Sequence, residues 1–322
     1  MMYNIFIDLS NKQTVYSVGY PTDIFEVVRM IDQARIDDLY INHSRRWEDF
    51  KYIYPVLSRR SRGISLGIDL SPACECTFNC VYCQVEKHNL SNIPNCNREI
   101  DLDVLHEELH LLFVGTLKGL IFNHSPFVAT PEELRRLNDV AFSGNGEPTL
   151  SRYFLPVARI AADVRQEYDG KDVKLVLITN STCLDRPDVI EGVDVLMANN
   201  GEIWCKLDAG TEAYYKKIDR SAVPFEKCVN NIISTAQRHK VIIQTLFSDV
   251  HGVEGPTDNE VDAYIAQLEK ILDANGEIDY VQVHTVRRIP AEKGVSALPR
   301  QRLEDIANRI TAQTGLKTSV YI

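Results

Sequence analysis

Short apolar runs rich in β-branched residues recur along this 322-residue chain, and stretches with helical periodicity separate them. Strands that alternate with helices are typical of βα units around a parallel sheet. Six strands with crossover helices favour an open or closed βα barrel over a sandwich. The expected strands span residues 64–70, 139–144, 173–179, 203–209, 241–247 and 280–286, with a further edge strand over 316–322.

Several helical stretches begin at a capping signal. The sequence TDNE at 257–260 is a capping box ahead of an apolar i, i+3, i+4 pattern. Asp101 is the expected cap of a helix over 101–113, and residues 302–310 are amphipathic. The sequence TPEE at 130–133 is a second box with proline at the first helical position, which predicts another helix start.

Composition and charge narrow the class of protein. The chain is 44% hydrophobic and 25% charged, which is ordinary for a globular protein. Its net charge of -10 makes it a poor general binder of polyanions, although a local basic patch could still bind one. The N-terminus does not resemble a secretory signal, and no apolar run approaches the roughly 20 residues that span a bilayer. We therefore expect a cytoplasmic protein without membrane association, whose cysteines are reduced.

The N-terminal part differs in pattern from the rest. Residues 1–62 are aromatic and mixed, and we expect them to form an extension to a barrel over 63–322. Residues 84–138 make a long insertion between the first two expected strands. The extension ends in a basic and aromatic segment over 44–63. That segment is either a docking surface or a solvated face above buried aromatic side chains.

Four of the eight cysteines fall within ten residues, in the sequence CECTFNCVYC from Cys74 to Cys83. Cys76, Cys80 and Cys83 have the spacing C-x3-C-x2-C and directly follow the first expected strand and its loop. Three thiolates on one loop can hold three irons of a cubane cluster and leave the fourth iron open. Zinc on all four would need an unusual spacing, because zinc sites usually separate two ligand pairs. The cysteines alone leave an iron–sulfur cluster, a zinc site and unligated thiols open.

Short polar motifs mark the ends of the next expected strands. SGNGEP (143–148) follows the second, ITNS (178–181) the third, and CKLDAG (205–210) the fourth. Together with C-x3-C-x2-C and an aromatic residue, Tyr82, before the last cysteine, this ordered set resembles the radical S-adenosylmethionine (SAM) superfamily. Within it, the motifs most resemble the wyosine-synthesis-like iron–sulfur oxidoreductases. The resemblance implies a partial (β/α)6 barrel of the TIM type, with the active site at the C-terminal ends of the strands.

The resemblance also implies the cofactors. Cys76, Cys80 and Cys83 would hold a [4Fe–4S] cluster, SAM would chelate the open iron, and Cys74 would be a spare. Reductive cleavage of SAM would give a 5′-deoxyadenosyl radical that abstracts hydrogen from a substrate in the barrel lumen. By its charge, the basic segment 44–63 could dock an acidic flavodoxin or ferredoxin as the reductant, or a nucleic acid backbone.

Further residues are assigned to SAM by the same resemblance. Glu147 would accept a hydrogen bond from the SAM amino group. The backbone around Gly144 and Gly146 would approach the ligand closely, since glycine has no Cβ. Asn145 stands where the family usually has glycine, and asparagine tolerates the left-handed conformation better than most residues. Tyr82 would lie near the adenine, unless it is simply a packed core aromatic.

The third and fourth strand ends supply the next candidates. Asn180 and Ser181 would approach the ribose and methionine portion, although both are also common turn residues. Lys206 and Asp208 alternate on one face of the fourth strand. Lys206 could neutralise the SAM carboxylate, and Asp208 could hold the ribose or the substrate. An internal bridge between these two side chains is the alternative.

Two polar residues lie within otherwise apolar strands. Gln244 and His284 alternate with apolar positions, so we expect both to face the lumen. His284 could contact adenine or substrate, or it could be a hydrogen-bonded structural residue. The substrate itself stays open. A small molecule is the main hypothesis for the substrate, and a tRNA or a partner protein that receives a radical are the alternatives. A zinc-stabilised binding module is the alternative to an enzyme.

Overall fold

The chain divides into Met1–His43, which lies outside the described residues, and a compact unit over Ser44–Ile322. All structural statements below concern the compact unit. The computed structural model describes residues 50–58, 60–71, 74–85, 99–252, 255–287 and 290–322.

One eight-stranded sheet runs through this unit, in the order β1-β2-β3-β4-β5-β6-β8-β10. β1 is antiparallel to β2, and every later pair of neighbours is parallel. Among the described residues, no pairing of β1 with β10 closes the sheet, so the barrel is open. The strands are Ile53–Ser58 (β1), Gly63–Ile68 (β2), Leu137–Phe142 (β3), Lys174–Thr179 (β4), Gly201–Lys206 (β5), Val241–Leu246 (β6), Ile278–His284 (β8) and Lys317–Tyr321 (β10).

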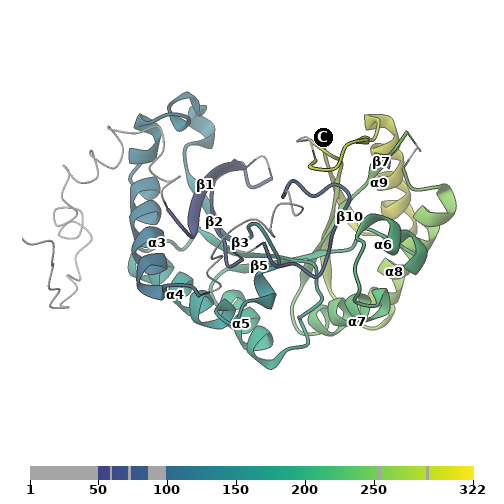
Figure 1. Cartoon of the computed structure of the whole chain (residues 1–322), viewed down its shortest axis with the longest axis horizontal. Coiled ribbons are helices and arrows are strands. Elements are labelled where there is room, and N and C mark those ends of the chain that lie inside the picture. The colour runs from purple at the N-terminus through teal and green to yellow at the C-terminus, as the bar shows by residue number, and fades with distance from the viewer. Residues whose placement is uncertain (1–49, 59, 72–73, 86–98, 253–254, 288–289) are drawn as a thin grey trace, which may run out of the picture. The chain divides into compact units, whose positions relative to one another are not determined.

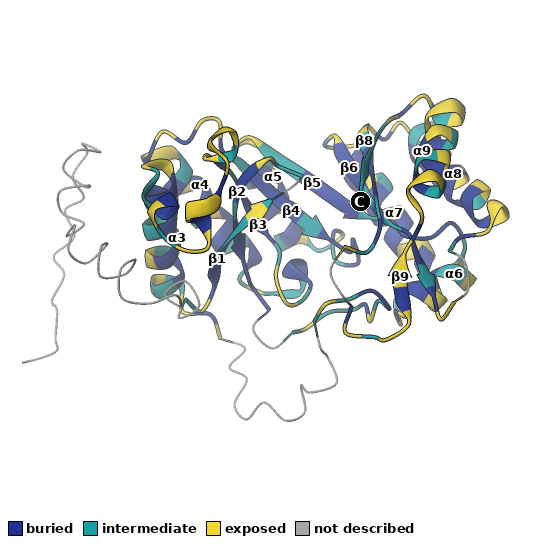
Figure 2. Ribbon diagram, turned by 90° about the horizontal axis from the view of Figure 1, so that it is seen from above, coloured by how far each residue is buried: buried dark blue, intermediate teal, exposed yellow. Residues whose placement is uncertain are grey.

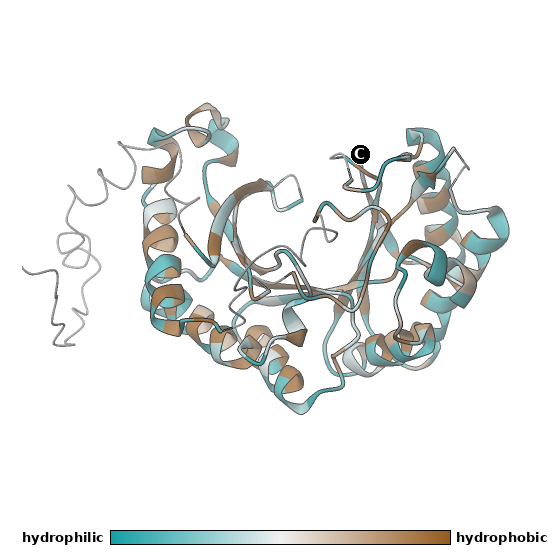
Figure 3. Cartoon of the chain, viewed as in Figure 1, coloured by the Kyte–Doolittle hydropathy of each residue, from teal (hydrophilic) through white to brown (hydrophobic). Residues whose placement is uncertain are grey.

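Helices cover the outer face of the curved sheet, and the inner face is left open (Figure 1). Their buried sides meet the strands and their exposed sides face solvent (Figure 2), in line with the hydropathy of the same surfaces (Figure 3). Ser248–Val250 (β7) and Val295–Ala297 (β9) form a separate antiparallel pair. The helices are Leu102–Leu117 (α3), Phe154–Glu167 (α4), Pro187–Met197 (α5), Glu212–Ile218 (α6), Phe225–Ala236 (α7), Asp258–Asp273 (α8) and Arg300–Thr314 (α9). None of the described helices combines the length and the hydropathy that a membrane span needs.

The structure confirms the α/β fold class, all six expected strands and the edge strand at the C-terminus. Thr257 caps α8 by accepting from the Glu260 amide, and Asp101 caps α3 in the same way. The helix start expected at 130–133 is wrong. Only a single 3-10 turn forms at Glu132–Leu134, and Pro131 at its start makes no side-chain capping bond. β3 begins so soon afterwards that no longer helix fits.

β1 was not expected from the sequence, which assigned its residues to the N-terminal extension over 1–62. The structure instead pairs β1 with β2 along its whole length. The amides of Lys51, Tyr52 and Ile53 donate to the Glu108 carboxylate of α3 at 2.8, 2.9 and 3.2 Å. This anchor holds the start of β1 against the helix layer, so the boundary placed at residue 62 cuts through a hairpin of the main sheet.

Glu260 joins α8 to the loop after β5, and its replacement is expected to be costly. Its carboxylate accepts from the Gly210 amide at 2.6 Å, and from the Thr211 amide at 3.1 Å and hydroxyl at 2.7 Å. Glu260→Gln places an N–H group where a donor already points, so we expect a loss of about 1–3 kcal/mol in the free energy of unfolding. Urea unfolding measures it. Glu277→Gln, at a side chain 70% exposed, is the control and should change stability very little.

Candidate active site

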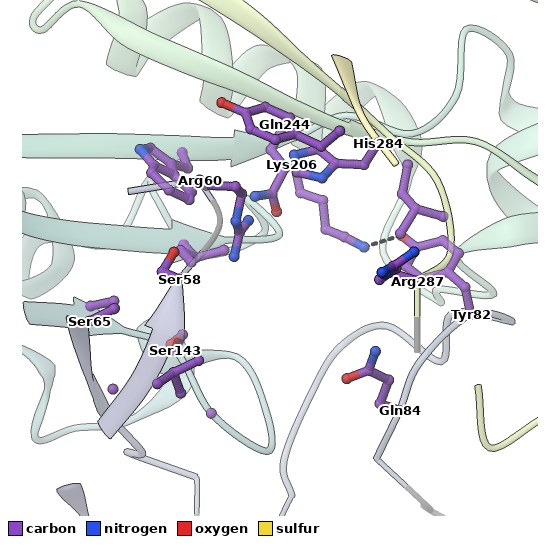
Figure 4. Close-up of a pocket in the computed structure, with 18 of the residues that line it drawn as sticks. Ser58, Arg60, Ser65, Tyr82, Gln84, Ser143, Lys206, Gln244, His284 and Arg287 are labelled. Carbon is purple, nitrogen blue, oxygen red and sulfur yellow. Dashed lines mark hydrogen bonds between the residues drawn. The ribbon is translucent and has the colours of Figure 1, made fainter. Parts of the chain in front are cut away.

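A cavity of about 510 Å³ lies inside the curve of the sheet, and we call this space the lumen. Side chains on a strand point alternately to its two faces, so every second residue of each strand faces it. Side chains of the lumen wall are drawn in Figure 4. The wall includes Tyr54, Val56 and Ser58 of β1, Ser65 and Gly67 of β2, Asp139 and Ala141 of β3, Ile178 of β4, Trp204 and Lys206 of β5, Gln244 and Leu246 of β6, His284 of β8 and Tyr321 of β10.

The cysteine loop lies over the C-terminal ends of the strands, where backbone bonds fix it on two sides. The Asn79 amide donates to the Asp219 carbonyl at 2.8 Å, and the Val81 amide donates to the Ile218 carbonyl at 2.9 Å. On the other side, the Glu147 amide donates to the Glu75 carbonyl at 2.8 Å. The loop is therefore held between the end of α6 and the turn after β3.

Cys76, Cys80 and Cys83 are half-buried cysteines on this loop that form no disulfide, and Cys83 lines the lumen. Donors surround two of the sulfurs. The Phe78 amide and the Asn180 side-chain amide lie 3.4 and 3.6 Å from Cys76 Sγ, and Lys206 Nζ lies 3.6 Å from Cys80 Sγ. Burial raises the pKa of the Cys80 thiol, and the Lys206 charge opposes that rise. Such donors favour the thiolate, which is the form that binds metals.

Three thiolates on one short loop are a donor set that fits an iron–sulfur cluster, because in a cubane cluster each thiolate binds its own iron. Among the described residues, no group of three or more His, Cys, Asp or Glu side chains is placed to hold a single metal ion. Cys74 differs from the other three in its backbone, because it adopts a left-handed φ of 56°.

The turn after β3 packs against the cysteine loop and the end of β2. A Cβ on Gly146 would lie 2.1 Å from the Glu75 carbonyl oxygen, and one on Gly144 would lie 2.5 Å from the Asp69 carboxylate. Asn145 has no positive φ. Its side chain instead donates to Asp69 Oδ2 at 2.6 Å. These two glycines therefore let the turn after β3 approach other segments of the protein closely. Asn145 links the ends of β2 and β3 through its bond to Asp69.

Gly146→Ala is expected to displace the cysteine loop. A contact of 2.1 Å with a backbone oxygen cannot be relieved by a side-chain rotation, so the loop has to move. We expect reconstituted Gly146→Ala protein to lose most of its iron while its circular dichroism spectrum stays that of wild type. Gly252→Ala is the control: its left-handed φ of 75° strains an alanine there, but nothing lies within 4 Å of the added Cβ, so its iron content should stay that of wild type. Full iron content in Gly146→Ala would show that the loop does not depend on this approach.

Glu147 is buried between the ends of β3 and β4, where four protein groups donate to its carboxylate. They are the Thr149 amide at 3.1 Å, the Thr149 hydroxyl at 2.6 Å, the Thr179 hydroxyl at 2.6 Å and the Asn180 amide at 2.7 Å. Burial raises its pKa, and these donors oppose the rise. Glu147 thus links the turn after β3 to the end of β4. Its contact with SAM stays a prediction.

Asn180 and Ser181 differ in what they contact. The Asn180 side chain donates to Thr77 Oγ1 at 2.8 Å, so it ties the cysteine loop to the end of β4. Ser181 is fully buried with a left-handed φ of 67°, and it is not part of the lumen wall. Of this pair, only Asn180 is brought to the cysteines.

Lys206, Asp208, Tyr82 and Asp219 form a buried network beside Cys80. Lys206 Nζ lies 2.9 Å from Asp208 Oδ2 and 4.0 Å from Asp219 Oδ1. The Tyr82 hydroxyl hydrogen-bonds to both Lys206 and Asp208. Burial opposes the charge on Lys206, but the charges of Asp208, Cys80 and Asp219 outweigh it and hold its pKa well above the usual value. The internal Lys206–Asp208 bridge is therefore present, and roles toward SAM stay predictions for these residues and for Tyr82.

Gln244 and His284 both line the lumen, and the fully buried Gln282 side chain links them. Gln282 Oε1 accepts from the Gln244 amide at 3.3 Å and lies 3.2 Å from His284 Nε2. The His284 ring stacks on Tyr321, with centroids 4.7 Å apart. The sequence reasoning missed Gln282, although its place two residues before His284 on the same strand puts it on the same face. It also missed Asp219, whose position no local motif marks.

Comparison with solved structures identifies the fold. TYW1 with a lysine-pyruvate adduct bound has a TM-score of 0.51 and 14% identity, covering 92% of this chain and 91% of that one. A radical SAM methyltransferase from Sphaerobacter thermophilus has a TM-score of 0.53 and 12% identity, covering 84% and 68%. Streptococcus suis SuiB bound to S-adenosylmethionine has a TM-score of 0.52 and 13% identity, covering 92% and 61%. The chain has the fold of radical SAM enzymes, as its motifs predict.

Sequence comparison adds distant relatives. No family model matches the chain. GTPase Obg of Brachyspira hyodysenteriae is 24% identical over 270 residues, 83% of this chain and 34% of that protein. UPF0026 protein MJ1312 of Methanocaldococcus jannaschii is 26% identical over 251 residues, 74% of this chain and 64% of that protein. The chain thus spans about a third of the first and less than two thirds of the second. Its sequence contains no G-x4-G-K-[S/T] phosphate loop.

Proposed function

We propose that this chain is a radical SAM iron–sulfur enzyme that acts on a small molecule held in the lumen. Cys76, Cys80 and Cys83 would hold a [4Fe–4S] cluster, with SAM beside it at the mouth of the lumen. When bound, this pair supplies a one-electron reductive cleavage that yields the 5′-deoxyadenosyl radical for hydrogen abstraction. The observation that carries the proposal is that the three thiols lie on one loop, with Cys83 lining the lumen, on a fold shared with radical SAM enzymes.

The residues of the chain have defined tasks in this proposal. The Lys206 ammonium donates to Cys80 Sγ and is held in place by Asp208 and Asp219. It thereby offsets part of the negative charge that three thiolates bring to the loop. Asn180 does the same for Cys76 through its side-chain amide. The loop lies over the lumen and helps to exclude water from a reactive radical.

The net charge of -10 favours a small-molecule substrate over a nucleic acid. Among the described residues of the basic segment 44–63, Tyr52 and Ile53 are buried and Arg60 lines the lumen, while Lys51 and Arg62 are exposed. A flavodoxin or ferredoxin is the proposed electron donor, because such proteins deliver single electrons.

The test is anaerobic reconstitution followed by an isotope experiment. We expect about four irons per chain and a brown protein that dithionite bleaches. With SAM and a deuterated metabolite extract, deuterium should appear in 5′-deoxyadenosine. A colourless protein with one zinc per chain would contradict the proposal. Formation of 5′-deoxyadenosine that rises only with added tRNA would contradict the small-molecule part alone.

A further inference from the structure

We propose that Glu292 is a positioning residue for the cluster, because it joins the segment that holds Cys83 to the helix end that holds Cys80. This inference rests on the proposed function, since Cys80 and Cys83 are two of the proposed cluster ligands. The segment that holds Cys83 covers residues 290–294, between β8 and β9, and we call it the strap.

The strap contacts the cysteine loop at its last cysteine. The Ala291 amide donates to the Cys83 carbonyl at 3.0 Å, and the Cys83 amide donates to the Cys80 carbonyl at 3.1 Å within the loop. In the part of the chain that the structure describes, the Ala291 bond is the hydrogen bond that reaches Cys83 from outside the cysteine loop. The strap therefore fixes the backbone at Cys83, as the end of α6 fixes it at Asn79 and Val81.

Glu292 ties the strap to the end of α6. Its carboxylate accepts from Arg220 Nη1 at 2.5 Å and from Arg220 Nη2 at 2.9 Å, a bidentate geometry that makes an arginine–carboxylate bond strong and directional. The bonds from Arg220 lower the pKa of Glu292, so its carboxylate is charged at neutral pH. Arg220 directly follows Asp219, whose carbonyl accepts from the Asn79 amide. The two segments that hold the cysteine loop are thus bonded to each other.

His251 fixes the strap from its other side. Its Nε2 lies 3.1 Å from Glu292 Oε1, and its amide donates to the Gly294 carbonyl at 2.6 Å. Gly294 adopts a left-handed φ of 87°, and a Cβ there would lie 2.6 Å from His251 Nδ1. The strap therefore turns closely against the end of β7, and Glu292 is held between His251 and Arg220.

Buried side chains from four segments form an apolar cluster next to these bonds. The cluster comprises Val81 and Tyr82 of the cysteine loop, Ile218 of α6, Val250 of β7 and Val295 of β9. Cys80 packs against it. In the ribbon views, α6 lies on the same side of the molecule as β7 (Figure 1) and β9 (Figure 2). A shift of the strap would therefore reach Cys80 through packing as well as Cys83 through the Ala291 bond.

The expected role of Glu292 follows from these contacts. A cubane cluster needs its three thiolates at fixed separations, because each thiolate binds its own iron. Glu292 keeps the segment that holds Cys83 fixed relative to the segment that holds Cys80. Without its charged bond to Arg220, the strap would open more often. We therefore expect faster loss of the cluster, and more frequent exposure of the Cys83 thiol in the cluster-free chain.

Glu292→Gln removes the charge and keeps the size of the side chain. A chelator should release iron from the reconstituted variant at least about tenfold faster than from wild type, the low end of the effects of outer-shell partners on metal binding. The electron paramagnetic resonance signal of the dithionite-reduced cluster should also change. Glu292→Asp keeps the charge and should lie between the two. Arg220→Gln removes the same bond from the α6 side and should match Glu292→Gln, so the test does not depend on the folding of one variant.

A second measurement needs no cluster. Iodoacetamide labels the cluster-free chain, and peptide mass spectrometry follows two half-buried cysteines separately, Cys83 in the cysteine loop and Cys183 in the loop after β4. We expect severalfold faster labelling of Cys83 in Glu292→Gln than in wild type. The labelling rate of Cys183 should be the same in both proteins.

Asp194→Asn is the matched control. The Asp194 carboxylate also contacts an arginine and a histidine, Arg238 Nη2 at 2.6 and 2.7 Å and His239 Nε2 at 2.6 Å, but it joins α5 to the end of α7. Iron release and Cys83 labelling of Asp194→Asn should equal those of wild type. Wild-type rates in Glu292→Gln, or an equal increase in Asp194→Asn, would overturn the positioning role. A wild-type chain that takes up no iron would instead contradict the proposed function, and the labelling rates would still decide whether the strap holds Cys83.

Discussion

Replacing Cys74 by alanine is expected to leave about four irons per chain after reconstitution, whereas Cys76→Ala, Cys80→Ala and Cys83→Ala should each lose most of their iron. Cys76 and Cys80 each have protein donors within 3.6 Å of their sulfur atoms, and Cys83 borders the lumen. Cys74 occupies the turn before them, where its amide donates to the Ser71 carbonyl at 2.7 Å. Alanine preserves that backbone bond and changes only the side chain.

Iron analysis and the visible absorption spectrum measure this result, and 5′-deoxyadenosine formation follows it. The four variants are matched because each removes one thiol from the same loop. Loss of iron from Cys74→Ala, with retention in Cys76→Ala, would mean that the ligand set is shifted by one cysteine. Equal loss of iron from all four variants would instead favour a metal site that uses all four thiols of the loop.

The parallel part of the fold could be predicted because each strand has an apolar run on a face covered by helices. β1 could not be predicted in this way, since its inner face lines a polar lumen and it is an edge strand of the sheet. Its burial alternates only weakly, and Pro55 and Ser58 dilute the apolar signal. What fixes β1 is the Glu108 carboxylate, a contact 55 to 57 residues away in sequence. No local pattern carries such information.

The candidate site likewise has features that a local sequence pattern predicts and features that depend on tertiary contacts. Its strand-end motifs were readable, because parallel strands bring their C-terminal ends to one edge. The motifs named Glu147 and Asn145, and the structure shows both bonded to protein groups at neighbouring strand ends, while their roles toward SAM stay predictions. Asp219 and Arg60 were not found, since their positions depend on how α6 and the β1–β2 hairpin pack. Motifs thus indicate where the site lies, while the contacts of each side chain come from the tertiary structure.

Lys206→Met is expected to lower the free energy of unfolding by about 3–5 kcal/mol. The Asp208 and Asp219 side chains are each 1% exposed, and Lys206 is the cation within 4.0 Å of both. Removing it leaves two buried carboxylates facing each other without a counter-charge, which is far more costly than losing an exposed pair. Methionine keeps the length of the side chain, so the loss reports charge more than packing. Urea unfolding of wild type and variant, prepared alike, measures the difference.

Two further variants decide how that loss arises. Lys174→Met breaks the Lys174–Glu202 pair, in which the lysine side chain is 42% exposed, and should cost less than about 1 kcal/mol. The double variant Lys206→Met/Asp219→Asn removes one of the stranded charges and should recover part of the stability. If Lys206→Met costs no more than Lys174→Met, the buried carboxylates do not depend on Lys206. In that case the network beside Cys80 is held together by its hydrogen bonds, among them those of the Tyr82 hydroxyl.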